Sequence, residues 1–185
     1  MSLFKTFSTT TRSSLKKSMW KNNIHQVPQI DKIVVTMWVW SLATRKWVKD
    51  FSELESDLSA ITAQKPYMIL SKKSVSNFKL REWMPAMLKT TLRSKKAYDF
   101  IERLTVLTLP RVRDFSWVSR KKFDWNWNYS IWFKSQSVFA EIVPETIKHE
   151  MWVQITIVTT ADTDEDAKLL LESLWIIFDK KVAVG

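Results

Sequence analysis

Alternating apolar and polar positions predict several short strands in this chain. Residues 33–37 place an apolar side chain at every second position, which is typical of a strand with one buried face. Across residues 87–93 the alternation puts Lys89, Thr91 and Arg93 on one face and leucine or threonine on the other. A strand of this kind can lay its basic, hydroxyl-bearing face on RNA. Further strands are predicted over residues 67–70, 129–133 and 153–159.

Helical spacing and capping residues predict the helices. A basic helix such as Arg12–Lys21 is expected within the first 24 residues, and the others are expected over residues 50–61, 95–107 and 164–174. Asp50 with Glu53 has the form of a capping box, Thr163 with Asp166 has the form of an N-cap, and Pro110 is expected to end the third helix.

These elements predict a single α+β domain in which an antiparallel β-sheet packs against helices. The chain shows neither an internal repeat nor a linker between domains. Residues 1–24 contain no acidic side chain, a composition that is also found in organellar transit segments. We favour a basic N-terminal helix or extension over residues 1–24, followed by one RNA-binding domain over residues 25–185.

Charge is distributed unevenly and indicates a polyanionic partner. The net charge of the 185 residues is +10, but residues 1–134 carry 25 Lys/Arg against 10 Asp/Glu, while residues 135–185 carry 4 against 9. A sustained net charge of +15 favours nucleic acid over a membrane surface. No apolar run approaches the ~20 residues of a spanning helix, so we expect no membrane partner.

Glycine is nearly missing, whereas tryptophan is abundant. Average usage predicts roughly 13 glycines in a chain of this length, yet there is one glycine and there are 11 tryptophans. Several tryptophans lie where turns and helix ends favour glycine, as in Asp124-Trp125-Asn126-Trp127-Asn128 and at Trp175. We hypothesise that the source encodes these positions with UGA codons that it reads as glycine, as some bacterial lineages do.

Residues suited to catalysis or metal binding are few. The chain has no cysteine and two histidines, and its main acidic cluster, residues 162–166, is explained by capping of a helix. If Trp38 and Trp40 are glycines, Gly-Val-Gly-Ser-Leu-Ala matches a dinucleotide-binding fingerprint, but the expected helix does not start inside it. We therefore expect no enzyme activity, no cofactor and no metal site.

If the tryptophans are literal, a second function is open. A basic, tryptophan-rich surface can stack single-stranded bases, which would make the chain a general binder of single-stranded nucleic acid. That function needs the indoles and the basic side chains on one face, whereas the sequence scatters the indoles through predicted turns. We rank it second.

Several blocks of sequence resemble the bacterial large-subunit ribosomal protein five family, whose members bind 5S rRNA. The blocks are IVVTMWVW (33–40), AITAQKP (60–66), KSVSNFKLR (73–81), KTTLR (89–93), LPRVRDF (109–115), FDWNWNYS (123–130) and IVTTADTDEDA (157–167). They occur in order between about Val27 and Phe178. The family has glycine at Trp38, Trp40, Trp83, Trp117, Trp125, Trp127, Trp132 and Trp175, and also at Ala63, Asn77, Met87 and Ser94.

The resemblance implies a structural constituent of the large ribosomal subunit with no catalytic activity. Its members hold 5S rRNA beside 23S rRNA in the central protuberance, together with other ribosomal proteins of that region. They also contact P-site tRNA and the head of the small subunit. We expect this chain to work in cytoplasmic ribosomes rather than organellar ones.

Family contacts can be carried over residue by residue. The resemblance assigns hydrogen bonds with 5S rRNA to Gln64 and Thr91, a basic contact to Lys32 and an aromatic contact to Phe78. Thr36 stands where the family usually has an RNA-contacting Asn, and a hydroxyl cannot make the two bonds of an amide.

Three further groups of residues complete the expected interface. We add Arg93 to the RNA-binding set because it shares a strand face with Thr91. Lys72, Lys73, Lys79 and Arg81 lie in a loop that resembles the segment approaching P-site tRNA, and the basic loop Ser116–Asn128 resembles the region facing the small subunit.

Overall fold

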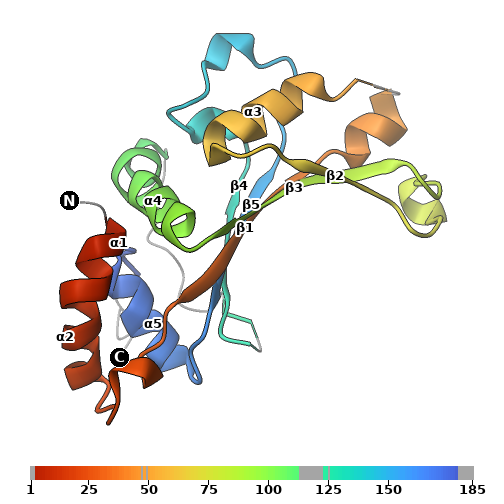
Figure 1. Ribbon diagram of the computed structural model, residues 1–185. Coiled ribbons are helices and arrows are strands. Elements are labelled where there is room, and N and C mark those ends of the chain that lie inside the picture. The colour runs from red at the N-terminus through yellow and green to blue at the C-terminus, as the bar shows by residue number, and fades with distance from the viewer. Residues whose placement is uncertain (1–2, 47, 49, 113–122, 125, 179–185) are drawn as a thin grey trace, which may run out of the picture. The chain divides into compact units, whose positions relative to one another are not determined.

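A single five-stranded antiparallel sheet with helices forms the framework, which confirms the α+β class (Figure 1). The computed structural model describes residues 3–46, 48, 50–112, 123–124 and 126–178. The strand order is β2-β3-β1-β5-β4. The strands are β1 (Ile30–Trp38), β2 (Tyr67–Leu70), β3 (Pro85–Arg93), β4 (Tyr129–Phe133) and β5 (Val153–Thr159).

Chain contacts group these elements into two compact units. Unit 1 comprises Met1–Ile33, Arg93–Ile131 and Thr156–Gly185, and unit 2 comprises Val34–Leu92 and Trp132–Ile155. Whether residue 24 marks a domain boundary stays a prediction.

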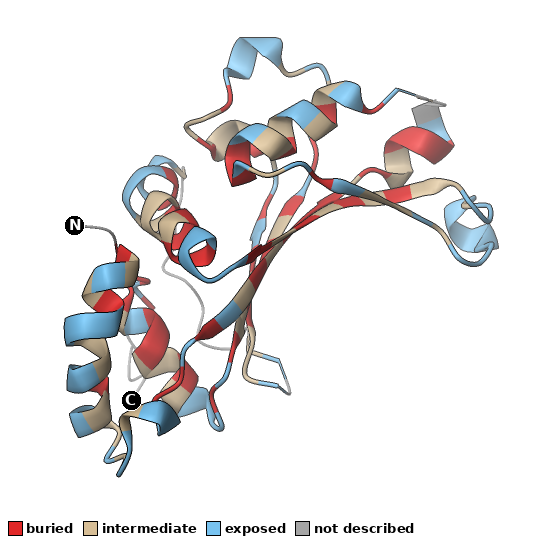
Figure 2. Ribbon diagram, in the orientation of Figure 1, coloured by how far each residue is buried: buried red, intermediate tan, exposed pale blue. Residues whose placement is uncertain are grey.

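The strands of unit 2 bury one face under a helix. In β3 the side chains of Ala86, Leu88, Thr90 and Leu92 are buried while the alternating ones are half-buried or exposed (Figure 2). Helix α3 (Ser52–Thr62) lies along this region and buries Leu54, Leu58 and Ile61. The predicted two-residue period of β3 is therefore confirmed. The short turns of unit 2 are η3 (Leu42–Lys46), η4 (Ser76–Phe78), η7 (Gln136–Val138) and η8 (Pro144–Thr146).

Unit 1 contains the remaining helices. The N-terminal segment is helical from residue 3 through α1 (Leu3–Thr6), η1 (Phe7–Thr11) and α2 (Arg12–Ser18), so helix begins nine residues before the predicted start near Arg12. Contacts join α1 to α4 and α2 to α5. The other helices and turns are η2 (Ile24–Gln26), α4 (Lys95–Arg103), η5 (Leu104–Thr108), η6 (Leu109–Arg111) and α5 (Asp164–Ser173).

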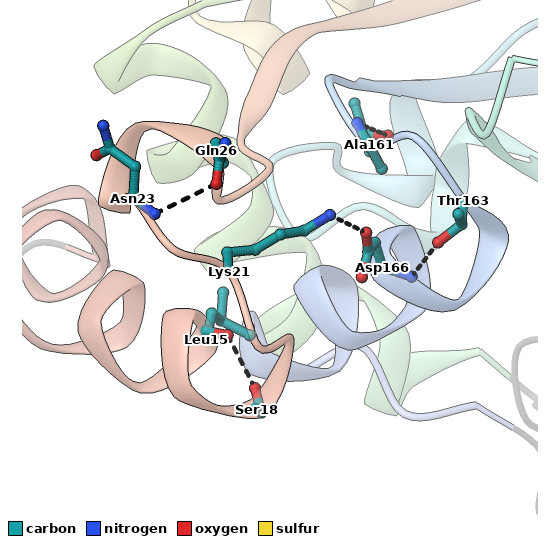
Figure 3. A network of polar contacts seen from close by, with 9 residues as sticks. Leu15, Ser18, Lys21, Asn23, Gln26, Ala161, Thr163 and Asp166 are labelled. Carbon is teal, nitrogen blue, oxygen red and sulfur yellow. Dashed lines mark hydrogen bonds and ion pairs between the residues drawn. The ribbon is translucent and has the colours of Figure 1, made fainter.

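Polar contacts fix the N-terminal segment and the start of α5 (Figure 3). Lys21 Nζ lies 3.0 Å from Asp166 Oδ2, and this hydrogen-bonded ion pair raises the pKa of Lys21. Thr163 Oγ1 accepts a 3.2 Å hydrogen bond from Asp166 N, which confirms the predicted N-cap of α5.

Two local predictions were wrong. The N-cap of α3 is Phe51 rather than Asp50, and Glu53 does not complete a capping box. Instead Asp50 Oδ1 accepts a hydrogen bond from Ser52 N, and Glu53 bonds Lys148 through that residue's backbone N–H (2.9 Å) and Nζ (3.3 Å). These hydrogen bonds, first among their causes, lower the pKa of both carboxyl groups.

The second wrong prediction concerns the end of the helix that begins at Lys95. Tyr98, Ile101 and Leu104 are buried as expected, but Val106 and Leu107 are exposed. The chain winds more loosely in η5, a π-helical turn, which shifts the phase of the apolar stripe.

Four tryptophans adopt the left-handed backbone conformation that favours glycine. The non-glycine residues with positive φ in the described part of the chain are Trp20 (52°), Ala63 (51°), Lys79 (53°), Trp83 (65°), Ser94 (51°), Trp127 (55°) and Trp175 (68°). Ala63 and Ser94 are positions at which the resembled family has glycine. This conformation costs a residue with a Cβ about 1–2 kcal/mol.

Trp20 and Trp175 both occupy the glycine position of a Schellman motif. After α5, Trp175 N bonds Glu172 O and Ile176 N bonds Leu171 O, each at 3.1 Å. After α2, Trp20 N bonds Lys17 O (3.4 Å), and Lys21 N bonds Lys16 O (3.2 Å) in the same pattern. These motifs support the glycine hypothesis, which remains a prediction. Trp47, Trp117 and Trp125 lie outside the described residues.

Candidate nucleic-acid interface

Unit 2 presents one sheet face away from its buried core, and we call this surface the open face. Successive side chains of a strand point to opposite faces of the sheet. Since one set of side chains in these strands is buried in the core, the other set lies on the open face. The residues of the open face are Val34, Thr36, Trp38, Tyr67, Ile69, Met87, Lys89, Thr91, Trp132, Trp152 and Gln154.

Two predicted RNA contacts meet beside the open face. Gln64 Nε2 donates a 3.2 Å hydrogen bond to the backbone carbonyl of Thr91. Gln64 follows Ala63, whose positive φ ends α3 and turns the chain toward β2. Both side chains are half-buried. The end of α3 and the strand β3 therefore place the Gln64 amide against the backbone of Thr91, and the RNA contacts assigned to these two residues stay predictions.

Thr36 lies on the open face but is nearly covered. Its exposed fraction is 8%, whereas Thr91 on the same face is half-buried. Trp38 follows two residues later on the same face of β1, and its indole Nε1 is buried with no hydrogen-bond partner among the described residues. A buried indole N–H normally finds a partner, so this position is unfavourable for tryptophan.

Phe78 lies in the basic loop of unit 2, between β2 and β3. Its ring is 55% exposed, and its centroid lies 5.2 Å from that of Trp40. The loop is closed by a bridge between Val75 and Leu80 and by a left-handed residue, Lys79. An aromatic ring held this way can stack on an unpaired base.

The same loop exposes four basic side chains around a cavity. Lys72, Lys73, Lys79 and Arg81 are exposed, and the last two line a cavity of about 700 Å³ together with Thr44, Ser74, Val75, Ser76, Leu80 and Met84. The described lining contains no acidic residue. The loop is therefore an electropositive surface, as predicted.

In unit 1, the predicted basic contacts share one carboxylate. Lys32 Nζ lies 3.5 Å from Asp31 Oδ2, and Arg93 Nη1 lies 3.5 Å from Asp31 Oδ1. The side chain of Arg93 is 59% exposed. Long, exposed ion pairs contribute at most about 1 kcal/mol, so a phosphate group can compete for both cations.

Four tryptophans gather in unit 2, which the sequence interpretation did not expect. Trp38, Trp40, Trp132 and Trp152 line a cavity of about 500 Å³ together with Ser41, Arg45, Glu150 and Met151. They come from β1, its following turn, β4 and the start of β5, so only the sheet topology reveals them as neighbours. The prediction that the indoles are scattered was wrong for these four.

The structure contradicts a dinucleotide-binding fold. Trp38 and Trp40 precede the π-helical turn η3, and β1 lies in an antiparallel sheet rather than in a parallel β-α-β unit. Among the described residues, no helix combines the length and apolar composition needed to cross a bilayer. The loop predicted to face the small subunit lies mostly outside the described residues, at 116–122 and 125.

Two family models and two curated relatives show which known proteins this chain is similar to. Residues 23–81 match the family described as "Ribosomal protein L5", and residues 85–178 match the model of the C-terminus of the same ribosomal protein family. The chain is 42% identical over 170 residues to "Large ribosomal subunit protein uL5" of Thermosipho melanesiensis, covering 92% of each chain. It is 43% identical over 166 residues to the protein of the same name from Dehalococcoides mccartyi, covering 90% of this chain and 92% of that relative.

Proposed function

Because this chain belongs to the uL5 family of large-subunit ribosomal proteins, we propose that it binds 5S rRNA and neighbouring 23S rRNA in the central protuberance. The family role is structural and not enzymatic. On this proposal the chain works in the cytoplasmic ribosome, where other proteins of the central protuberance are its neighbours.

Shape recognition in unit 2 supports this proposal. The hydrogen bond from Gln64 to the backbone of Thr91 places an amide side chain beside a strand that also carries a hydroxyl, and such groups suit the hydroxyls and splayed bases of folded RNA. Phe78 supplies a stacking ring. The contact between Gln64 and Thr91 is the single observation that carries the proposal, because it joins two residues that were assigned separately to the same RNA.

The basic side chains of unit 1 strengthen binding to RNA without recognising its nucleotide sequence. Lys32 and Arg93 neutralise phosphates when RNA displaces their weak contacts with Asp31. No reaction is required at this surface, and the interface works by position, charge and shape.

The basic loop of unit 2 has a separate proposed partner. Lys72, Lys73, Lys79 and Arg81 approach the P-site tRNA and hold its backbone by charge. The loop Ser116–Asn128 contacts the head of the small subunit. Both assignments rest on the family resemblance and on the abundance of basic residues in these loops.

The cavity with four tryptophans favours a second candidate function. Trp132 and Trp152 are 45% and 52% exposed beside Arg45, an arrangement that can stack single-stranded bases. This candidate does not use Phe78 or Lys32, and it predicts indole fluorescence quenching by any oligonucleotide.

The double variant Lys32→Glu with Phe78→Ala tests the proposed interface. It removes a stacking platform and reverses one charge, so we expect about a hundredfold weaker binding of 5S rRNA. The measurement is a filter-binding titration at physiological salt, with circular dichroism to show that the fold is retained.

A matched control carries equivalent changes away from the proposed interface. Lys17→Glu with Val106→Ala reverses an exposed charge and truncates an apolar side chain that is 54% exposed, close to the 55% of Phe78. We expect its affinity to stay within about threefold of the parent. Unchanged binding by the Lys32/Phe78 variant refutes the assigned surface.

A further inference from the structure

A cavity in unit 1 brings two arginines together beside the N-terminal helical segment. Its volume is about 430 Å³, and the residues that matter for its chemistry are Arg12, Asp31, Arg93, Ser94 and Tyr98. None of the sequence patterns identified it, because its lining comes from residues about 80 positions apart. The RNA-binding set assigned from the sequence includes Arg93 but not Arg12.

Aromatic contacts hold the helical segment in place above this cavity. The rings of Phe4 and Phe7 lie 5.5 and 5.0 Å from the ring of Tyr98, centroid to centroid. Leu3 N also donates a 3.2 Å hydrogen bond to Glu102 Oε2 on α4. Because these contacts come from the turns that precede Arg12, they hold the backbone of Arg12 beside the cavity that its side chain lines.

Arg12 carries a buried donor without a partner. Its Nε is inaccessible to solvent and makes no hydrogen bond to any described residue. Leaving a charged donor buried and unbonded is costly, and native proteins rarely do so without a function. The planar guanidinium is the side chain best suited to bonding two oxygens of a phosphate.

The rest of the lining favours an anion. Arg93 adds a second guanidinium, whose Nη1 makes a 3.5 Å contact with Asp31. Asp31 is the carboxylate of the lining, and Lys32 remains its partner when Arg93 turns to another anion. Burial raises the pKa of the Tyr98 phenol, so Tyr98 adds no negative charge at physiological pH.

The start of α4 also favours binding of an anion in this cavity. Ser94 is the N-cap of α4 and makes no side-chain capping bond. The first turn of α4 contains no acidic residue and begins with Lys95 and Lys96. The positive end of the helix dipole therefore faces the cavity, and the first turn of α4 brings no carboxylate of its own to neutralise it.

We propose that this cavity binds a backbone phosphate of ribosomal RNA through Arg12 and Arg93. The proposal rests on the RNA-binding function proposed above and adds a second contact surface, on unit 1. RNA is the favoured occupant because the chain is a large-subunit ribosomal protein whose first 134 residues carry a strong positive charge. The bound phosphate satisfies the guanidinium of Arg12 and anchors the N-terminal segment on the RNA.

The test compares Arg12→Gln with Lys17→Gln, which removes an equal charge from an exposed position of the same helix. Each variant is titrated with 5S rRNA and with 23S rRNA over a range of salt concentrations. We expect Arg12→Gln to weaken binding of at least one RNA about tenfold and to make the log–log salt slope shallower by about one. Lys17→Gln is expected to stay within about twofold.

Stability distinguishes this function from a structural role. Without RNA, Arg12→Gln is expected to unfold at the same urea concentration as the parent or a higher one, because it removes a buried guanidinium N–H that has no partner among the described residues. Inorganic phosphate should also shift the unfolding midpoint of the parent upward but leave that of Arg12→Gln unchanged.

Two results overturn the inference. One is parental affinity of Arg12→Gln for both RNAs, and the other is a loss of stability in that variant without RNA. If the Lys32/Phe78 variant loses affinity while Arg12→Gln does not, only the cavity assignment fails. If neither variant loses affinity, the proposed RNA interface fails as well.

Discussion

Replacing Trp20, Trp83, Trp127 and Trp175 together by glycine is expected to raise the free energy of unfolding by about 3 kcal/mol. Each of these residues has a φ between 52° and 68°. At each position, glycine removes a backbone penalty of about 1–2 kcal/mol. It also costs about 0.4–1 kcal/mol of stability, because glycine makes the unfolded chain more flexible. The four positions lie in separate turns, so their effects should add.

Urea unfolding of the parent and the fourfold variant measures this gain. Trp132→Gly is the matched control, because Trp132 lies inside β4 and does not have a positive φ. Glycine within a strand should lower stability by about 0.5–1 kcal/mol. If the fourfold variant gains nothing, or gains no more per position than the control, the backbone argument fails.

The codons at these positions provide an independent test of the glycine hypothesis. The glycine hypothesis predicts UGA at the tryptophan positions of the source gene, including the three outside the described residues. UGG codons would refute it. The four tryptophans of the unit 2 cavity would then be literal, and the stacking function would gain support.

Binding of 5S rRNA is expected to weaken about a thousandfold between 50 and 200 mM monovalent salt. Neutralising about six phosphates predicts a slope of roughly −5 for log affinity against log salt. Arg12, Lys32, Lys89 and Arg93 supply four of these cations, and we expect the others to come from further basic side chains of residues 1–134. Filter-binding titrations at several salt concentrations measure the slope directly.

The second candidate function, binding of single-stranded nucleic acid by the tryptophans of unit 2, predicts that affinity depends less on salt concentration. Stacking of bases on Trp132 and Trp152 depends less on counterion release and tolerates any sequence. A slope shallower than about −2 for the parent would contradict the electrostatic account. A control with Phe78→Ala alone should lower affinity at every salt concentration and keep the slope, because a ring releases no counterions.

Much of the sheet could be predicted from sequence because its patterning is local. The bounds of β2, β4 and β5 were predicted correctly, and the alternation in β3 identified its buried face. Thr163 was recognised as an N-cap because that signal depends on a few neighbouring residues. The family blocks then pointed to Gln64 and Thr91, which the structure brings together.

Sequence reasoning failed where a distant residue decided the outcome. Glu53 suits a capping box locally, but Lys148 takes up its carboxylate from 95 positions away. The looser winding of η5 exposed Val106, which no simple period anticipates. Arg12 looked like one more basic residue of an N-terminal helix, because only the tertiary structure places its guanidinium in a cavity.

Specific recognition of 5S rRNA tests the central claim most directly. The measurement is equilibrium binding of the chain to 5S rRNA and to an unrelated folded RNA of the same length, at physiological salt. The interface described for Gln64, Phe78 and Thr91 predicts a preference of about a thousandfold for 5S rRNA, in the range that separates specific from non-specific complexes. Equal affinity for the two RNAs would contradict it.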